Sequence, residues 1–312
     1  MTKKVLLVSY SQSGQLDDIL HSIIGPLASS DKVSITHHTI KPVKPYPYPW
    51  DLITFMDAFP ESAHLVPCEI EEIDDNNDYD LVILGYQVWF LSPSIPTTAF
   101  LKSRYASEKL KNTPVITVIG CRNMWVMASL KVKTLLEQIG AKLIDNIVLT
   151  DQGASYATFV TTPRWMFTGK KDAFLNIFPK AGVSQEDIDN AQRFGKAILQ
   201  GLLNNRESES LCTGLKACRV DEKLIPSEKM ATKSFKIWGA LIRKLGDPGS
   251  PRRKPAVLLY LVFLLLIILT VVPINMLIQT ILRKLNPKKI AQLRQTYEQP
   301  SGSADHRMQE FL

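Results

Sequence analysis

The sequence predicts an α/β fold in which helices cover both faces of a five-stranded parallel sheet and a long apolar helix follows. Short runs rich in β-branched residues alternate with runs of helical spacing, which is the pattern of repeated βα units. The strand-like runs are almost continuously apolar, as expected when both faces of a parallel sheet are buried. The third observation is a stretch of 27 uncharged residues near the end of the 312-residue chain.

The predicted strands are residues 5–9, 33–39, 81–86, 115–120 and 143–149. Helical spacing occurs between them at 15–28, 97–110 and 124–139. Residues 184–203 are predicted as the closing helix because Ser184 can serve as its N-cap. Ligands of such a sheet bind beyond the carboxyl ends of the strands, so the loops at those ends are the candidate site.

The loop after the first strand has the composition of a phosphate cradle. Hydroxyl groups at Ser11 and Ser13 can bond phosphate oxygens, Gly14 lets the backbone approach closely, and the first N–H groups of the next helix face an anion. The lysine of a nucleotide P-loop and the Gly-x-Gly-x-x-Gly spacing are both missing, so a single phosphate fits best. The alternative is that the serines only cap the helix.

Residues 10–15 resemble the first loop of the flavodoxin-like family, which holds the phosphate of flavin mononucleotide (FMN); Leu16 replaces the last hydroxyl of that pattern. The resemblance implies the flavodoxin-like strand order 2-1-3-4-5. It also implies FMN contacts from the loop residues, which are Ser11, Gln12, Ser13, Gly14 and Gln15.

Two further strand ends resemble the other cofactor loops of that family. After the third strand, Gln87, Val88, Trp89 and Phe90 precede a proline-rich turn; Trp89 is the predicted ring-stacking residue and Phe90 the second choice. The alternative is that both aromatic residues fill the core. After the fourth strand, the predicted contacts are Arg122, Asn123 and Met124. Arg122 is the predicted catalytic residue, since its charge can stabilise a reduced flavin or an acidic substrate.

Charge and hydropathy predict membrane attachment. Residues 1–210 contain 20 Lys and Arg against 23 Asp and Glu, whereas the remaining residues contain 17 against 7. Residues 256–282 are uncharged and long enough to cross a bilayer, with basic residues on both sides. Pro273 interrupts this run, so a spanning helix and a segment lying in one leaflet are both open. A buried core helix is the third interpretation.

The predicted organisation follows from these features. Residues 1–205 form the FMN domain, with insertions at 41–66 and 151–183; 206–232 are a polar linker, 233–255 a basic amphipathic segment, 256–282 the membrane segment and 283–312 a basic polar tail. No secretory signal precedes the first strand, so the flavin domain is expected to face the cytoplasm. No metal site is predicted, because His37 and His38 are adjacent on a strand and point to opposite faces. The basic segment is assigned to lipid, so no nucleic acid is expected as a partner.

These features predict a membrane-attached FMN-dependent oxidoreductase acting on a lipophilic quinone-like or polyketide-derived ring, with NAD(P)H as a candidate electron donor. The Pro-Tyr-Pro-Tyr-Pro-Trp and Cys-Arg-Asn-Met-Trp segments and the apolar C-terminal run resemble the dialkylresorcinol condensing enzymes of bacteria. That resemblance implies ring oxidation beside a ketosynthase. A one-electron carrier docking on a membrane partner and a non-catalytic membrane adaptor are the alternatives.

Overall fold

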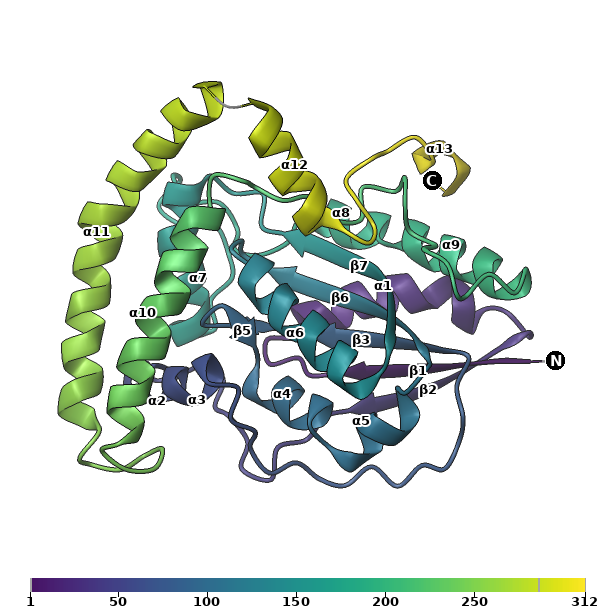
Figure 1. The fold of residues 1–312 in the computed structure, drawn as a ribbon, viewed down its shortest axis with the longest axis horizontal. Helices are drawn as coiled ribbons and strands as arrows, with labels where there is room; N and C mark the ends of the chain where they lie inside the picture. The colour runs from purple at the N-terminus through teal and green to yellow at the C-terminus, as the bar shows by residue number, and fades with distance from the viewer. Residues whose placement is uncertain (1, 286, 312) are drawn as a thin grey trace.

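The structure is a computed structural model that describes residues 2–285 and 287–311. Five parallel strands form the sheet in the order β2-β1-β3-β6-β7 (Figure 1). The strands are β1 (Lys3–Ser9), β2 (Val33–Thr39), β3 (Leu81–Tyr86), β6 (Pro114–Cys121) and β7 (Lys142–Thr150). Val5 of β1 lies opposite Ile35 on one side and Leu81 on the other. The predicted flavodoxin-like strand order is therefore confirmed.

Helices cover both faces of the sheet, as predicted. On one face the core joins Val5 and Leu7 of β1 to α1 (Gln15–Ala28), α8 (Gln185–Asn190) and α9 (Gln192–Leu203). On the other face it joins Leu6 and Val8 to α4 (Ile95–Leu101), α5 (Arg104–Lys109) and α6 (Val126–Ile139). The side chains of β1 alternate between the two cores because the side chains of a strand repeat every two residues.

Two predicted helices are broken in the structure. The helix expected at 97–110 is divided into α4 and α5, because Ser103 caps the start of α5 by accepting from the Ala106 N–H. The closing helix is divided at Ala191 into α8 and α9. Its predicted cap is confirmed, since Ser184 Oγ accepts from the Asp187 N–H over 3.1 Å.

The insertions fold into short elements. Residues 41–66 contain α2 (Leu52–Asp57) and α3 (Phe59–Ala63), and residues 151–183 contain α7 (Ser155–Thr168). A two-stranded hairpin, β4 (Val88–Trp89) and β5 (Ser92–Pro93), follows β3. Its two turn residues, Phe90 and Leu91, both have positive φ angles, of 48° and 58°. Such a turn reverses the chain sharply at a steric cost for side chains with a Cβ.

Residues 206–232 differ from the polar linker that the composition predicts. Leu211, Cys212, Leu215 and Cys218 are buried, and the Val148 N–H of β7 donates to Ala217 O over 2.8 Å. The carboxylate of Asp145, on β7, is fully buried and accepts from the N–H groups of Leu211 and Cys212. This segment therefore covers an edge of the sheet, which leaves fewer unpaired backbone groups exposed.

The predicted polar tail also returns to the domain. It contains α12 (Pro287–Glu298) and α13 (Met308–Phe311), and Phe311 packs into the core beside α9. Ser301 Oγ donates to Asp145 Oδ1 and accepts from the Asn146 N–H, both over 2.7 Å. The tail therefore contributes side chains to the interior beside β7.

A helical hairpin precedes this tail. Helices α10 (Ile225–Arg243) and α11 (Lys254–Leu285) lie side by side at one side of the domain (Figure 1). Helix α10 packs on α3, and α11 contacts both α10 and α2. Within the part of the chain that the structure describes, α11 contains the one helical segment, Lys254–Asn275, that is long and apolar enough to cross a membrane. The side chains of Arg283, Lys284 and Lys289, which belong to the predicted basic flank, lie outside the described part.

Candidate functional site

The loop between β1 and α1 has the backbone geometry expected of an anion cradle. Gly14 is the residue before α1 and has a φ of 81°, which favours glycine because a side chain would be strained there. No side chain in the described part of the chain caps the start of α1. Ser11 Oγ is buried and, among the described residues, has no hydrogen-bond partner. An unpaired buried hydroxyl is costly, so the loop is suited to an acceptor such as a phosphate oxygen.

Acidic residues oppose an anion at the same helix end. Asp17 and Asp18 lie in the first turn of α1, where they already complement the helix dipole. Compensation has to come from a nearby cation or from dipoles of the loop. Arg122, described below, is such a cation.

The first insertion is hydrogen-bonded to the cradle through Gln12. Gln12 Oε1 accepts from Trp50 Nε1, and Gln12 Nε2 donates to Pro47 O, both over 2.8 Å. The backbone N–H of Trp50 donates to Met166 O of the second insertion over 2.9 Å. The two insertions thus contact each other beside the cradle. In the structure, both polar atoms of the Gln12 side chain are therefore bonded to the first insertion.

The second insertion is held by Gln15. Its Oε1 accepts from the Val183 N–H over 3.2 Å, and its Nε2 donates to Val183 O over 3.4 Å. Gly182 has a φ of 90°, and a Cβ there would lie 2.5 Å from Gln15 Nε2. Gln15 therefore holds residues 182–183 over the strand ends in this arrangement. Its direct contact with a ligand stays a prediction.

A small cavity of about 70 Å³ lies at these strand ends. It brings together four of the predicted site residues, which are Ser13, Gln15, Gln87 and Arg122. Gln87 Oε1 is buried and has no hydrogen-bond partner among the described residues, so a second unpaired polar atom occurs at this end of the sheet. The cavity is far smaller than the roughly 300–1,000 Å³ of most ligand pockets, so a flavin ring requires the covering residues to move apart.

Arg122 is the cation of this cavity. Its Nε donates to Thr158 Oγ1 over 2.8 Å, and its guanidinium carbon lies 3.9 Å from the centroid of the Phe159 ring. Burial lowers the pKa of Arg122 to about 10, and the nearby Asp151 carboxylate opposes that change. Arg122 therefore stays positively charged at neutral pH. Asp151 accepts from the Gly153 and Gly182 N–H groups, which fixes its carboxylate beside the cavity.

Trp89 does not line the cavity. It is buried in the core, and its ring centroid lies 5.1–5.9 Å from those of Tyr10, Tyr46 and Trp50, all in edge-to-face geometry. Phe90 packs on Phe55, with centroids 4.7 Å apart. In this arrangement the two rings pack as in the core-filling alternative, because each is in contact with other aromatic rings. Stacking on a flavin stays a prediction.

The other predicted contacts lie outside the cavity lining as well. Val88 is paired with Pro93 in the β4–β5 hairpin. Met124 has a φ of 55° and, with Asn123, belongs to the turn that leads into α6. Cys121 does line the cavity, but burial raises the pKa of its thiol far above the usual range. A protonated thiol is a poor nucleophile, which agrees with a structural role for Cys121.

The two histidines of β2 have separate partners. His37 Nε2 lies 3.1 Å from Ser9 Oγ, and His38 Nε2 lies 3.3 Å from Asp75 Oδ2. Among the described residues no group of three or more His, Cys, Asp or Glu side chains could hold a metal ion.

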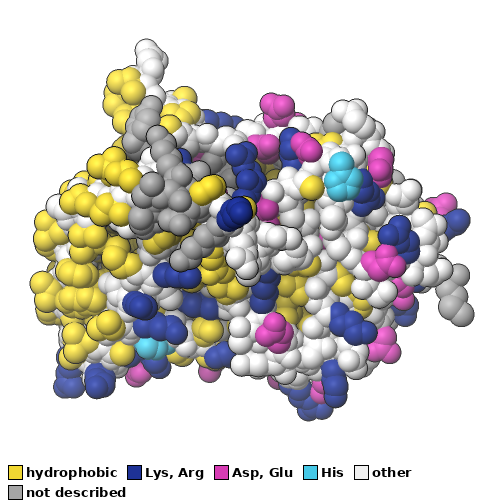
Figure 2. Space-filling model, turned by 45° about the horizontal axis from the view of Figure 1, so that its top comes forward, with side chains coloured by type: hydrophobic (Ala, Val, Ile, Leu, Met, Phe, Trp, Pro, Cys, Tyr) yellow, Lys and Arg dark blue, Asp and Glu magenta, His cyan; other side chains and the backbone are white. Residues whose placement is uncertain are grey.

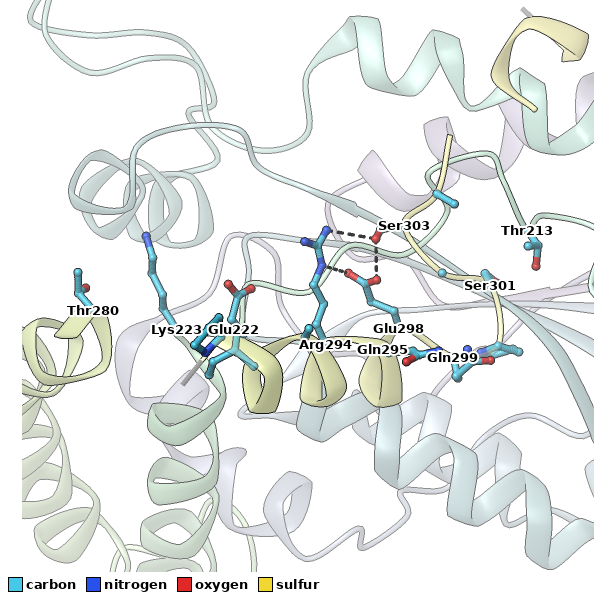
Figure 3. A pocket seen from close by; sticks show the side chains of 16 residues that line it. Thr213, Glu222, Lys223, Thr280, Arg294, Gln295, Glu298, Gln299, Ser301 and Ser303 are labelled. Atoms are coloured by element: carbon cyan, nitrogen blue, oxygen red, sulfur yellow. Dashed lines mark hydrogen bonds and ion pairs between the residues drawn. The ribbon is translucent and has the colours of Figure 1, made fainter. Parts of the chain in front are cut away.

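A larger cavity, of about 760 Å³, lies beside α12 (Figure 3). Two of its charged residues are paired with each other: Glu298 accepts from Arg294 Nε over 2.8 Å, and it also accepts from Ser303 Oγ over 2.6 Å. Glu298 also accepts from the Val220 N–H over 3.0 Å. These bonds join α12 to the segment that covers β7, so the polar groups of this cavity have a structural role.

Sequence reasoning missed the contribution of the second insertion to the site. The cavity is also lined by Asp151, Thr162, Trp165 and Gly182. The sequence signals were Asp151-Gln152-Gly153 directly after the last strand and an aromatic run around Trp165. Neither signal indicates which strand end the insertion covers.

No protein-family model and no curated protein matches the chain. Among solved structures, a flavoprotein of Lactobacillus acidophilus in complex with FMN is similar at 18% identity and a TM-score of 0.37, over 47% of this chain and 93% of that one. A flavodoxin from the domain Archaea is similar at 11% identity and a TM-score of 0.34, over 64% and 99%. Oxidised flavodoxin 1 of Bacillus cereus is similar at 14% identity and a TM-score of 0.33, over 62% and 95%.

Proposed function

We propose that this chain is a membrane-attached, FMN-dependent oxidoreductase acting on a lipophilic quinone-like or polyketide-derived ring. The observation that carries the proposal is a pair of buried polar atoms, Ser11 Oγ and Gln87 Oε1, which have no hydrogen-bond partner within the described residues. They lie on loops that follow two neighbouring strands. Ligands of a sheet with this strand order bind beside these strand ends. A phosphate at the first loop and a polar ring edge at the second would satisfy both atoms.

Each residue of the site has a distinct task in this proposal. Ser11, Ser13 and the N–H groups at the start of α1 would hold the phosphate, and Gly14 keeps the loop open to it. Bound FMN would supply hydride transfer, a chemistry for which the protein itself provides mainly binding and tuning. Arg122 would hold a positive charge beside the site, because its pKa of about 10 keeps it ionised at neutral pH.

The covering insertions support an enzyme over a one-electron carrier. A carrier passes electrons through an exposed flavin edge, whereas Gln12 and Gln15 hold both insertions over the strand ends here. A closed site that opens for substrate excludes water from the reaction. The finer parts of the proposal are NAD(P)H as donor, ring oxidation in dialkylresorcinol biosynthesis beside a ketosynthase, and a flavin domain facing the cytoplasm. These parts are predictions from the sequence and from the family resemblance.

The second candidate is a non-catalytic membrane adaptor. The observation that favours it is the cavity of about 70 Å³, which is too small for a flavin ring without movement. The adaptor would need no cofactor, so measuring flavin separates the two functions.

The test is the flavin content of the full-length chain purified in mild detergent, followed by titration of added FMN. We expect flavin absorbance, or quenching of FMN fluorescence on binding. Ser11→Ala should weaken FMN binding roughly ten- to hundred-fold, since a hydrogen bond to a charged group contributes about 1.5–3 kcal/mol. Ser107→Ala is the matched control, because Ser107 is an exposed serine on α5. A colourless protein that binds no added FMN would contradict the proposal.

A further inference from the structure

We propose that α11 lies in the plane of one membrane leaflet, with its outward face among the acyl chains, and does not cross the bilayer. This inference rests on the proposed function, which includes membrane attachment, and specifies the orientation of α11 in the membrane. The expected partner of α11 is a leaflet that contains anionic lipids. Three observations carry it: the anchored start of α11, its occupied inner face, and the return of the chain to the same domain.

The start of α11 is anchored by Arg253. This residue is fully buried; its guanidinium donates to Glu61 Oε2 over 2.8 Å and lies 2.9 Å from Asp57 Oδ1. It also donates to Asp57 O over 3.1 Å. Asp57 and Glu61 belong to the first insertion, so this ion pair fixes the start of α11 to α2 and α3. A buried pair of this kind is costly to break because each partner would remain as an unpaired charge.

The inner face of α11 stays in contact with the domain beyond this anchor. Val257 and Tyr260 are buried, and the ring centroids of Tyr260 and Phe59 lie 4.5 Å apart. Further along, Asn275 Nδ2 donates to Ser227 Oγ of α10 over 2.9 Å. From Arg253 to Asn275 the helix extends about 33 Å, which is about the thickness of the hydrocarbon core.

The outer face of α11 is exposed and apolar, and Figure 2 shows hydrophobic side chains gathered over this side of the molecule. It includes Leu258, Leu259, Val262, Leu265, Leu266, Leu269, Ile274, Leu277, Ile278 and Ile281. On α10, Ile237 and Leu241 are exposed as well, at 70% and 51%. A contiguous apolar surface that extends over two helices is typical of a membrane or protein interaction site.

The chain returns to the domain after α11. Glu298, at the end of α12, accepts from the Val220 N–H, and Ser301 bonds Asp145 and Asn146 of β7. Both ends of the α11–α12 segment are therefore attached to one folded unit. A helix that crossed the bilayer would place these ends in different aqueous compartments.

Crossing would also bury polar groups in hydrocarbon. The partner of the inner face is α10, which contains Ser227, Glu228 and exposed lysines such as Lys229 and Lys236. Carrying α10 into the bilayer beside α11 would cost several kcal/mol for each charge or unpaired polar group. Lying in one leaflet avoids this cost, since only the outer face meets the acyl chains.

Basic residues at the turn of the hairpin favour anionic lipid as the partner. Lys244, Arg252 and Lys254 are exposed there, while Asp247 is the one acidic residue in the described stretch from 243 to 254. Figure 2 shows Lys and Arg side chains along the margin of the hydrophobic surface. Each such residue strengthens binding at an anionic surface, and the apolar face supplies the larger part of the affinity.

The experiment measures the depth of single spin labels in vesicles of phosphatidylcholine and phosphatidylglycerol. The full-length chain carries Cys68→Ser and Cys121→Ser, which leaves two buried cysteines, Cys212 and Cys218. Labels are placed by cysteine substitution on the outer face of α11, at Leu258, Val262, Leu266, Leu269 and Leu277. Lys142→Cys, at the start of β7, is the water-exposed control. Depth is read from the relative accessibility to oxygen and to a water-soluble nickel complex.

We expect similar, shallow depths at all five positions, about 5–10 Å below the headgroup boundary. A depth profile that is greatest at Leu266 and Leu269 and falls towards both ends would overturn the inference in favour of a spanning helix. Labels that contact no lipid, in a protein that elutes as a dimer, would show that a second copy covers the face.

Vesicle flotation and flavin content are measured on the same samples. A protein that does not float contradicts membrane attachment itself, and with it this inference. A protein that floats and binds FMN but shows the spanning profile refutes only the in-plane geometry. As a second readout, an impermeant maleimide added outside sealed vesicles should label Gln292→Cys on α12 as fully as Lys142→Cys. Protection of the α12 position alone would place it across the membrane and refute the proposal.

Discussion

Glu228 should make the folded protein less stable at neutral pH than at mildly acidic pH. It lies on α10 with 1% of its surface exposed, and its Oε2 accepts from the Met127 N–H over 2.8 Å. No side chain of its own segment caps the start of α6, so Glu228 provides that function from another helix. Glu228→Gln keeps an oxygen acceptor at this place and removes the ionisation.

The expected magnitude follows from the pKa of this carboxyl group. Burial raises the pKa of Glu228 from 4.5 to about 7, and the bonds from the Met127 and Val126 N–H groups oppose part of that change. The folded state therefore binds the proton more tightly than the unfolded state. Stability should fall as the pH rises through this interval and level off above it, by roughly 3 kcal/mol in total.

The assay is urea unfolding of the full-length protein in one detergent, followed by tryptophan fluorescence at pH values from about 4.5 to 8. The free energy of unfolding of the native protein minus that of Glu228→Gln should fall across this range. Every other titrating group is present in both proteins, so the difference isolates Glu228. Glu137→Gln, on the exposed side of α6, is the matched control and should leave the profile unchanged. Parallel profiles for the native protein and Glu228→Gln would refute the reasoning.

Three other substitutions test the site and the core. Gly14→Val places a β-branched residue at a φ of 81°, so it should lower the free energy of unfolding by at least about 1 kcal/mol and abolish most FMN retention. Normal flavin absorbance in this variant would contradict the assignment of this loop as a phosphate cradle. Arg253→Met removes the buried cation beside Glu61 and leaves only the more exposed Arg243, at 3.6 Å. It should lower the free energy of unfolding by up to about 3–5 kcal/mol, whereas a loss under 1 kcal/mol would mean that the pair is solvated. Trp89→Ala should lower the free energy of unfolding of the flavin-free protein by about 3–5 kcal/mol, as measured by urea unfolding. If the variant has normal stability but no longer binds flavin, Trp89 stacks on the flavin instead.

The strands and their order could be predicted because local sequence determines them. Each strand is a short apolar run, and its burial on both faces follows from the parallel arrangement. The breaks at Ser103 and Ala191 were missed because helical spacing continues across them. The polar composition of 206–232 was misleading: Asp145, on another element, satisfies the N–H groups that polar loops normally expose to water.

The site could be predicted only in part. The cradle is contained in one loop, so its glycine and serines are visible in the sequence. The neighbours of Trp89 are not visible in the sequence, because Tyr46 and Trp50 belong to an insertion whose position over the sheet depends on tertiary contacts. Likewise, Arg253 could be recognised as basic, but its burial against Glu61 joins residues 192 positions apart.

The return of the chain to β7 has a consequence for the order in which the protein forms during translation. Asp145 needs Ser301 as one of its partners, and 156 positions separate the two residues. Because synthesis proceeds from the N-terminus, α11 is made before Ser301. The outer edge of β7 therefore stays incomplete until the apolar helix has been made. The sheet that carries the candidate site is thus completed late, although most of its residues are made first.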